Sequence, residues 1–419
     1  MPLELLHLSS VIHRPLVDRD GERIGRIEDV VARLGGSHPP VVGVVVRIEG
    51  RDLFVPIRKV ASFERGRARF EGKRVDLRRF ERRPGEVLLA HDLLARHLIN
   101  FVRGRLITAN EIELANVEGT WEVVGVDVGR RPLLRRLLGG RLGSKVATTS
   151  LVDFAQIEPF VGHVPSARLR IPYRRLSKLH PAQIADLVEA ASHEEGEEII
   201  EAVGLDRELE ADVFEELDTE HQLEFIDQRS DDDAARLLSR MAPDDAADLI
   251  SEVDQERRLP LLELMAEPQQ RKVRNLLSYP AESAGGLMSP DYVGVAATAT
   301  VEEALDATRT ATAPIEALNV VFALDDDGRL AGSVPVVTLV RSRPTAHVAD
   351  VMRADPAHVH PHWDVHRIAR TMSDFNLTVV PVLEESHGRV LGVVTVDDLL
   401  ELLLPQGWRR DFGMTAVEE

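Results

Sequence analysis

A twelve-residue period in the middle of the chain restricts its possible folds more than any other feature. The residues that start the successive units are Asp206, Asp218, Ser230, Ala242, Asp254 and Ala266. Four of these are Asp or Ser, whose side-chain oxygen accepts an N–H that the first turn of a helix leaves unpaired. Pro243 suits a first helical position. Each unit therefore predicts a helix of about two turns, stable only when stacked on its neighbours. The sequence does not give the hand of the resulting superhelix.

The N-terminal part carries a second repeat, with β character. Runs of β-branched residues at 41–48 and 53–57 alternate with turn signals. An offset of 82 residues maps Arg14, Leu16, Val17, Ile24, Asp29 and Val30 onto Arg96, Leu98, Ile99, Leu106, Glu111 and Ile112. A basic, glycine-rich insertion at 129–149 lacks the spacing of a phosphate-binding loop. We expect two small β-domains, at residues 1–82 and 83–174.

The last third of the chain contains two modules, 288–344 and 346–404, in which a helix, a strand, a turn and a second strand follow in the same order. The expected helix and strands are 301–308, 319–324 and 330–334 in the first module, and 365–375, 378–383 and 390–395 in the second. Before them, Pro280 ends a helix because it lacks an N–H donor. Gly285 and Gly286 then allow a sharp turn.

Composition limits the kinds of site that the chain can hold. With 419 residues it needs several cores, and with no cysteine it has no disulfide or thiolate metal site. No run approaches the roughly 18 apolar residues of a membrane span, and no secretory signal is evident, so we expect a cytoplasmic protein. Residues 1–178 hold 32 basic and 21 acidic side chains, whereas the remainder holds 19 and 49. The basic part is suited to acidic partners and the acidic part to cations.

Several segments resemble known families. LHPAQIADLVEA and MAPDDAADLISEV (179–190 and 241–253) resemble repeats in the N-domain of MgtE magnesium channels, and the joint at 276–293 resembles the one that precedes their CBS domains. GRVLGVVTVDDLLELL (388–403) resembles the end of a CBS domain. DRDGERIGRIEDVV, which starts at Asp18, resembles PRC-barrel adaptor modules. These resemblances imply a multidomain α+β chain: two PRC-like β-barrels, a helical superhelix at 175–287, a tandem CBS pair at 288–404 and a tail at 405–419.

The MgtE resemblance implies a magnesium site. In that family, acidic residues of the N-domain face acidic residues of the second CBS module, and Mg²⁺ binds between them. The match places this role on Asp244 and Asp248 on one side, and on Asp398 and Glu401 on the other. Asp244 and Asp248 are four residues apart and share a helix face, and Mg²⁺ prefers such hard oxygen ligands. The alternative interpretation is a solvated acidic surface.

The CBS resemblance also implies that Thr395 and Asp398 hold the ribose of an adenine nucleotide. The alternative is that Thr395 or Asp397 caps the helix that begins near Asp398. The first module reads GSVPVVTLV, with Pro335 and no aspartate, so a complete nucleotide site is not expected in it.

A second cation site of the family retains Asp364, but its two other carboxylates correspond to His366 and Asn376, so we expect it to be weakened or lost. His358, His360, His362 and His366 surround it. His362 and His366 are four apart and would share a helix face near Asp364. Transition-metal binding and pH sensing are two interpretations, and ordinary surface or capping histidines are the favoured one.

No catalytic motif is present, so an enzyme is not expected. In MgtE proteins a membrane domain follows the CBS pair, whereas here 15 residues follow Leu404. We therefore expect a Mg²⁺-responsive regulatory or adaptor protein that forms a homodimer through its CBS modules and acts on a partner such as a separate membrane transporter. The alternatives are an adenine-nucleotide sensor and a factor that binds RNA or ribosomes through its PRC-like domains.

Overall fold

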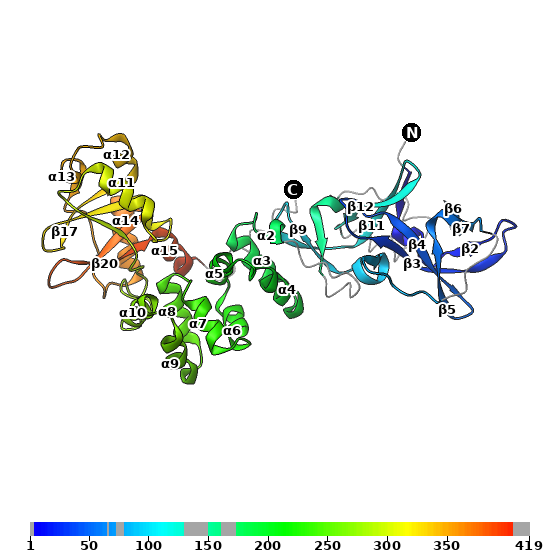
Figure 1. Ribbon diagram of the computed structural model, residues 1–419, viewed down its shortest axis with the longest axis horizontal. Helices are drawn as coiled ribbons and strands as arrows, with labels where there is room; N and C mark the ends of the chain where they lie inside the picture. The colour runs from blue at the N-terminus through cyan, green and yellow to red at the C-terminus, as the bar shows by residue number, and fades with distance from the viewer. Residues whose placement is uncertain (1–3, 65–66, 73–78, 130–149, 161–172, 405–419) are drawn as a thin grey trace. The chain divides into compact units, whose positions relative to one another are not determined.

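The computed structural model describes residues 4–64, 67–72, 79–129, 150–160 and 173–404. The tail at 405–419 and most of the basic insertion lie outside these residues. The chain divides into two compact units, Met1–Leu217 and Asp218–Glu419. Their elements are labelled in Figure 1.

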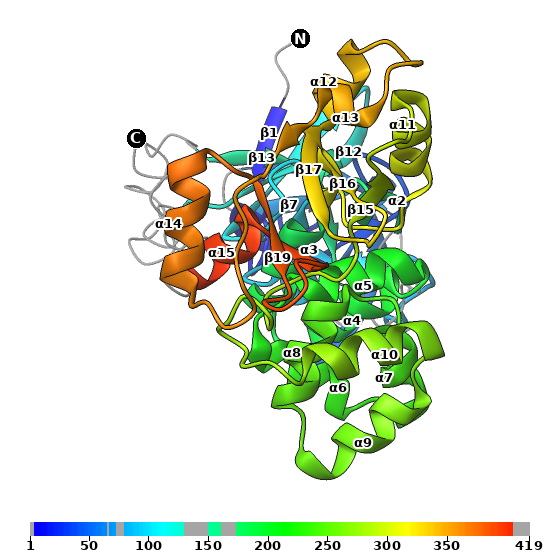
Figure 2. The ribbon, with the colours of Figure 1, turned by 90° about the vertical axis from the view of Figure 1, so that its left-hand side faces the viewer.

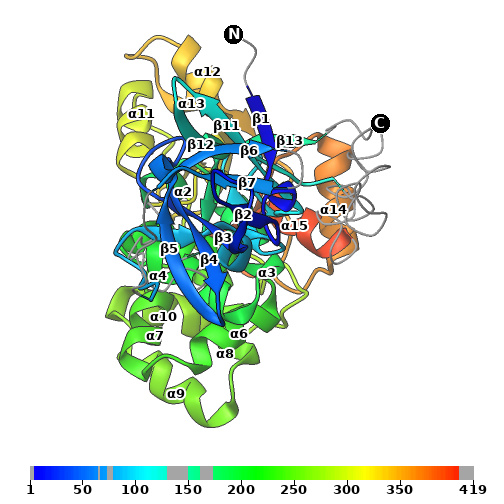
Figure 3. The ribbon, with the colours of Figure 1, turned by 90° about the vertical axis from the view of Figure 1, so that its right-hand side faces the viewer.

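The first β-repeat forms most of one sheet. Its strands are β2 (Pro15–Val17), β3 (Arg23–Arg33), β4 (Val41–Ile48), β5 (Arg51–Pro56), β6 (Val60–Glu64) and β7 (Arg67–Phe70), in the order β5-β4-β3-β2-β7-β6. Figure 3 shows β3, β4 and β5 side by side. Glu49 and Gly50, at φ +49° and +77°, make the two-residue turn between β4 and β5.

The second repeat forms two smaller sheets. Its strands are β8 (Glu86–Leu88), β9 (His97–Asn100), β10 (Arg105–Thr108), β11 (Glu111–Val117), β12 (Thr120–Asp127), β13 (Leu151–Asp153) and β14 (Ile157–Pro159). Strands β11, β12 and β13 lie in one sheet, and β10, β9 and β14 lie in the other.

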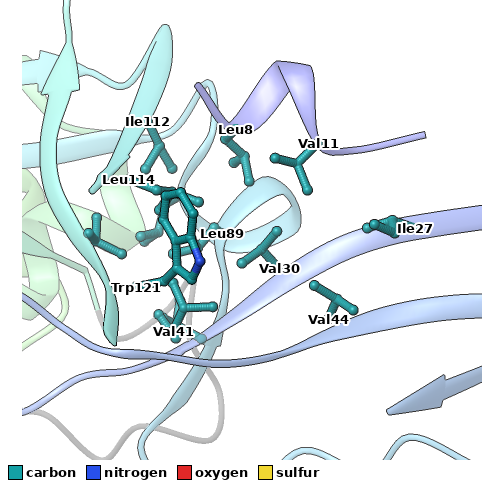
Figure 4. Close-up of a cluster of buried hydrophobic side chains, with 14 of the residues drawn as sticks. Leu8, Val11, Ile27, Val30, Val41, Val44, Leu89, Ile112, Leu114 and Trp121 are labelled. Carbon is teal, nitrogen blue, oxygen red and sulfur yellow. The ribbon is translucent and has the colours of Figure 1, made fainter. Parts of the chain in front are cut away.

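The two repeats exchange their first strands. Strand β1 (Glu4–His7) pairs with β11 of the second repeat, while β8 pairs with β3 of the first. Side chains from both repeats then pack in one hydrophobic core (Figure 4), including Val30 and Val44 from the first repeat and Leu89 and Trp121 from the second. The boundary near residue 82 therefore separates two sequence repeats, but the expectation of two separate β-domains is corrected to one interlocked unit.

A buried carboxylate from each repeat caps the short helix of the other. The Asp29 carboxylate accepts N–H bonds from Ala90 and His91 at 2.8 and 2.9 Å, at the start of η3 (Leu89–Leu93). Glu111, its match in the repeat, accepts the N–H of Ser9 at 3.1 Å in η1 (Leu8–Ser10). This reciprocal capping explains why an acid recurs at this position. Burial raises the pKa of Asp29 to about 6, although its three backbone N–H bonds oppose the rise.

Helices α2 (Tyr173–Leu176), α3 (Pro181–Ala190), α4 (His193–Val203) and α5 (Arg207–Glu215) complete the first unit. They contact the second β-repeat. His97 Nδ1 lies 3.2 Å from the carboxylate of Glu195 on α4, and the Arg175 guanidinium lies over the ring of Phe101 at 5.5 Å. The β-region and the first helices of the array are thus in direct contact.

The helical array continues in the second unit. Its helices are α6 (Thr219–Asp227), α7 (Asp231–Leu238), α8 (Pro243–Glu252), α9 (Gln255–Leu264) and α10 (Glu267–Leu276). All six residues predicted to start the units are the N-caps of α5 to α10, and Pro243 is the first residue of α8. Each helix packs on the one two places along, as α6 does on α8 and α7 on α9. Arg257 of α9 ties these layers together through Asp231 at 2.8 Å and the carbonyl oxygen of Ile226.

The CBS modules have the expected order of elements. The first contains β15 (Val293–Ala296), α11 (Val301–Thr310), β16 (Val320–Leu324), β17 (Leu330–Pro335) and α12 (Val336–Arg341). The second begins with α13 (Val348–Val351) and β18 (Arg353–Ala354), and β18 pairs with β17 of the first module. It continues with α14 (Val365–Phe375), β19 (Val379–Leu383), β20 (Val390–Thr395) and α15 (Val396–Leu403). Helices α14 and α15 lie beside β19 in Figure 2. The predicted helices and strands differ from these bounds by two residues at most.

The joint after α10 is hydrogen-bonded to the second CBS module. Ala284 and Gly285 donate N–H bonds to the carbonyl oxygens of Trp363 and Pro361 at 2.8 and 2.9 Å. A Cβ atom on Gly285 would lie 2.5 Å from the Tyr279 ring, which explains the glycine. Within the described residues, no helix is both long and apolar enough to cross a membrane.

Candidate functional site

Helix α8 carries the first pair of predicted metal ligands. Asp244 and Asp248 are separated by one turn of this helix, as their spacing predicts. Protein atoms packed around the Asp248 carboxyl raise its pKa to about 6, and the neighbouring Glu252 carboxylate adds to the rise, although the residue is exposed to solvent. A cation there would relieve this unfavourable charge and remain reachable from solvent.

Asp398 belongs to a different environment at the start of α15. Thr395 is the N-cap of this helix, and its N–H donates to Asp398 Oδ2 at 2.9 Å. Burial raises the pKa of Asp398; the bonds from Thr395 oppose the rise, and the carboxylates of Asp397 and Glu316 add to it. Thr395 is thus the N-cap of α15, as one form of the capping interpretation predicts. Sequence reasoning missed Glu316, because no short-range pattern connects this residue of the first module with the second.

The residues predicted to hold magnesium lie on two helices, α8 and α15. Glu252 is the carboxylate that acts on Asp248, whereas Asp397 and Glu316 act on Asp398. Among the described side chains, no three His, Asp or Glu residues form a group that could hold a metal ion. Glu401 lies on α15, but its side chain is outside the described part.

The second predicted cation site is split by a helix. Asp364 is the N-cap of α14 and accepts the N–H of Arg367 at 3.0 Å, while Asn376 ends the same helix in the left-handed conformation, at φ +53°. Twelve residues of helical rise separate them by about 18 Å. Asp364 and Asn376 therefore cannot share an ion, and both have capping roles.

The predicted helix face of His362 and His366 is wrong. Helix α14 begins at Val365, so His362 precedes it, and its ring lies 6.5 Å from that of Tyr279 in the joint. His366 is exposed on α14. The closer contact is between His358 and His360, whose ring centres are 5.5 Å apart.

Two side chains near β20 were missed by the sequence analysis. The Ser289 hydroxyl is buried and has no hydrogen-bond partner among the described residues, next to Val393, with which its backbone pairs. Tyr292 Oη donates to the carbonyl oxygen of Val390 at 3.3 Å. Both follow the joint, and their partners Val390 and Val393 lie about 100 residues further along the chain, so no local sequence pattern indicates these contacts. In the first module Thr338 occupies the position that Asp398 has in the second, three residues after the cap, so no carboxylate is present there.

Family models match most of the chain in separate parts. Residues 4–75 match the PRC-barrel domain, residues 179–282 the MgtE intracellular N domain, and residues 284–343 and 348–405 the CBS domain. The PRC-barrel match ends before β8 and covers the first repeat.

Two curated relatives are similar to part of the chain. The magnesium transporter MgtE of Thermus thermophilus is 35% identical over 158 residues, which are 38% of this chain and 35% of that protein. MgtE of Enterococcus faecalis is 28% identical over 148 residues, or 35% and 32% of the two chains. The chain thus spans about a third of the length of these relatives.

Two crystal structures show the same fold over 55% of this chain. The soluble part of a magnesium transporter aligns with a TM-score of 0.51 and 23% identity over 90% of its length. The cytosolic domain of the Mg²⁺ channel MgtE in complex with ATP aligns with a TM-score of 0.50 and 30% identity over 93% of its length. The chain therefore joins a PRC-barrel domain to an MgtE-type intracellular N domain and a CBS pair.

Proposed function

We propose that the helical domain and the CBS pair form a Mg²⁺-responsive regulatory unit, whose state the β-region passes to a partner such as a separate membrane transporter. The observation that carries this proposal is a pair of carboxyl groups with raised pKa values, Asp248 and Asp398, on the two domains that the MgtE relatives share. Both have raised pKa values, because surrounding protein atoms and neighbouring carboxylates disfavour their charged forms, although Asp248 is exposed. Their hard oxygen atoms are the ligands that Mg²⁺ prefers.

Conformational change would supply the response. An ion held by both Asp248 and Asp398 would favour an arrangement in which α8 and α15 lie close together. A ligand shifts a conformational equilibrium by its difference in affinity for the two states. Direct contacts such as His97–Glu195 connect the helical array to the β-region, which gives the β-region access to that change.

Thermal unfolding with and without Mg²⁺ tests this proposal. The full chain should show a saturable stabilisation that approaches about 2.7 kcal/mol per site at 100 times Kd. Asp248→Asn and Asp398→Asn should each reduce it, while Asp326→Asn, in the turn between β16 and β17, should not. Because protons compete for Asp248, the stabilisation should weaken as the pH falls through about 6. An equal, non-saturating response in all variants would contradict the proposal.

A homodimer through the CBS modules forms part of the proposal. Val340 on α12 and Leu400 on α15 occupy matching positions in the two modules and are 66% and 47% exposed, and Val337 is 64% exposed. Light scattering of the full chain should give twice the mass of 46.5 kDa. Val340→Asp with Leu400→Asp should give a monomer; an unchanged mass would place any dimer contact elsewhere.

Adenine-nucleotide sensing is the second candidate, favoured by the ATP complex of the relative with 30% identity. Thr395 is 4% exposed and already caps α15, so a nucleotide would have to use a site that also stabilises the helix. Calorimetry with ATP, ADP and AMP tests this candidate. Heat that is lost in Thr395→Val, in a variant with unchanged far-ultraviolet circular dichroism, would support it; no heat in the wild type would exclude it.

A further inference from the structure

His358 and His360 lie on an extended segment beside β19. Between them, Val359 is fully buried and pairs with Val382, through an N–H bond to Pro381 O at 3.0 Å. Residues two apart on an extended segment point to the same side. The two histidines are partly exposed on the side opposite Val359, and their ring centres are 5.5 Å apart.

Backbone carbonyl groups fix the same tautomer in both rings. His358 Nδ1 lies 3.1 Å from Pro356 O, and His360 Nδ1 lies 3.1 Å from Leu383 O. A carbonyl oxygen only accepts hydrogen bonds, so each Nδ1 carries the proton and each Nε2 keeps a lone pair. Metal-bound histidines have this arrangement, in which the second ring nitrogen donates to a carbonyl or carboxylate.

The separation of the rings fits a shared ion. With Zn–N bonds of about 2.0–2.1 Å and a tetrahedral angle, the centres of two imidazoles on one ion are about 5 Å apart. Divalent transition metals accept neutral imidazole, whereas Mg²⁺ favours oxygen. We propose that His358 and His360 form a two-histidine site for a divalent transition metal ion such as Zn²⁺ or Ni²⁺.

Water completes the coordination of this site. No third His, Asp or Glu among the described residues joins the pair, and His362 lies next to Tyr279 instead. The site is therefore open, separate from the proposed Mg²⁺ function, and independent of Asp248 and Asp398. Because Pro361 O and Trp363 O accept the N–H groups of Gly285 and Ala284, an ion at this site restrains the joint between the helical domain and the CBS pair.

Calorimetry on the tag-free full chain, pretreated with chelator and kept in Mg²⁺ buffer, tests the site with ZnCl₂ and NiCl₂. One ion should bind per chain. His358→Ala and His360→Ala should each weaken that binding at least tenfold, while His366→Ala, which removes an exposed histidine of the same module, should not. Equal affinity in all four proteins, or no binding in the wild type, would overturn the proposal.

His360→Ala also removes the hydrogen bond to Leu383 O at the end of β19, so it could change the structure as well as the site. A second measurement therefore uses the wild-type protein. Paramagnetic Ni²⁺ should broaden the ring-proton resonances of His358 and His360 in the wild type before those of His366 and His387. Zn²⁺ should slow hydrogen exchange at the amides of Ala284 and Gly285. Broadening that begins at any other histidine would overturn the site, and unchanged exchange would overturn the restraint of the joint.

Discussion

The β-repeats and the helical array are both built by repetition, but they are held together in opposite ways. In the β-region, β1 pairs with β11, with Glu4 opposite Asn116, and one core serves both copies. In the array, each helix begins at its own cap and packs on helices at most two units away. The comparison teaches that repetition alone does not set cooperativity. Exchanged strands should make the β-region unfold as one body, whereas the array can lose stability locally.

The largest effect is expected from a cavity in the shared core, which tests whether the two β-repeats unfold together. Leu89 belongs to the second repeat and is fully buried beside side chains of the first. Leu89→Ala should lower the free energy of unfolding by about 2–5 kcal/mol. Amide hydrogen exchange should accelerate equally in β4 of the first repeat and β12 of the second. Leu205→Ala, at a side chain 64% exposed, should change stability by less than about 0.5 kcal/mol. Faster exchange confined to β12 would show that the repeats fold separately.

The contact between the two repeats at Asp29 can be tested through the pH dependence of the free energy of unfolding. Its pKa is about 6 in the folded protein and 3.8 ordinarily, so the protonated form is favoured by folding. This contribution to stability is fully present below about pH 3.8 and is lost as the pH rises through about 6. The loss amounts to about 2–3 kcal/mol.

Asp29→Asn should remove that loss. Unfolding free energies measured between pH 4 and 7 should fall for the wild type relative to the variant, with the change centred between the two pKa values. Glu22→Gln, in the turn before β3, controls for the removal of one exposed negative charge. Parallel pH profiles for wild type and Asp29→Asn would show that the buried cap does not titrate in this range.

The same contrast explains what the sequence could predict. Caps such as Ser230 act within three residues, so spacing alone located all six helix starts. The match between Asp29 and Glu111 was also visible as a repeat. The capping role of these two residues could not be predicted, because each carboxylate caps a helix about 60 or 100 residues away. The candidate sites follow the same rule: the roles of Thr395 and Asp364 as caps are local, whereas Glu316 beside Asp398 and the His358–His360 pair depend on tertiary packing.

The smallest effect is expected at the caps of the array, where two matching positions can be exchanged. Ser230 caps α7: its hydroxyl accepts the N–H of Asp233 at 3.2 Å and donates to the carboxylate of Asp233 at 2.7 Å. Ala266 occupies the same place in the period before α10, is exposed, and makes no side-chain cap bond. Ser230→Ala should cost about 1 kcal/mol, and Ala266→Ser should gain up to about the same amount.

Hydrogen exchange should locate both effects. Ser230→Ala should accelerate exchange in α7 and in α9, which packs on it, and Ala266→Ser should slow exchange in α10 and α8. The strands of the β-region should keep their wild-type rates in both variants, because no exchanged element connects the array to them. Equal changes in β4 and α7 would mean that the whole chain unfolds as one body, and the distinction between an interlocked region and a locally stabilised array would fail.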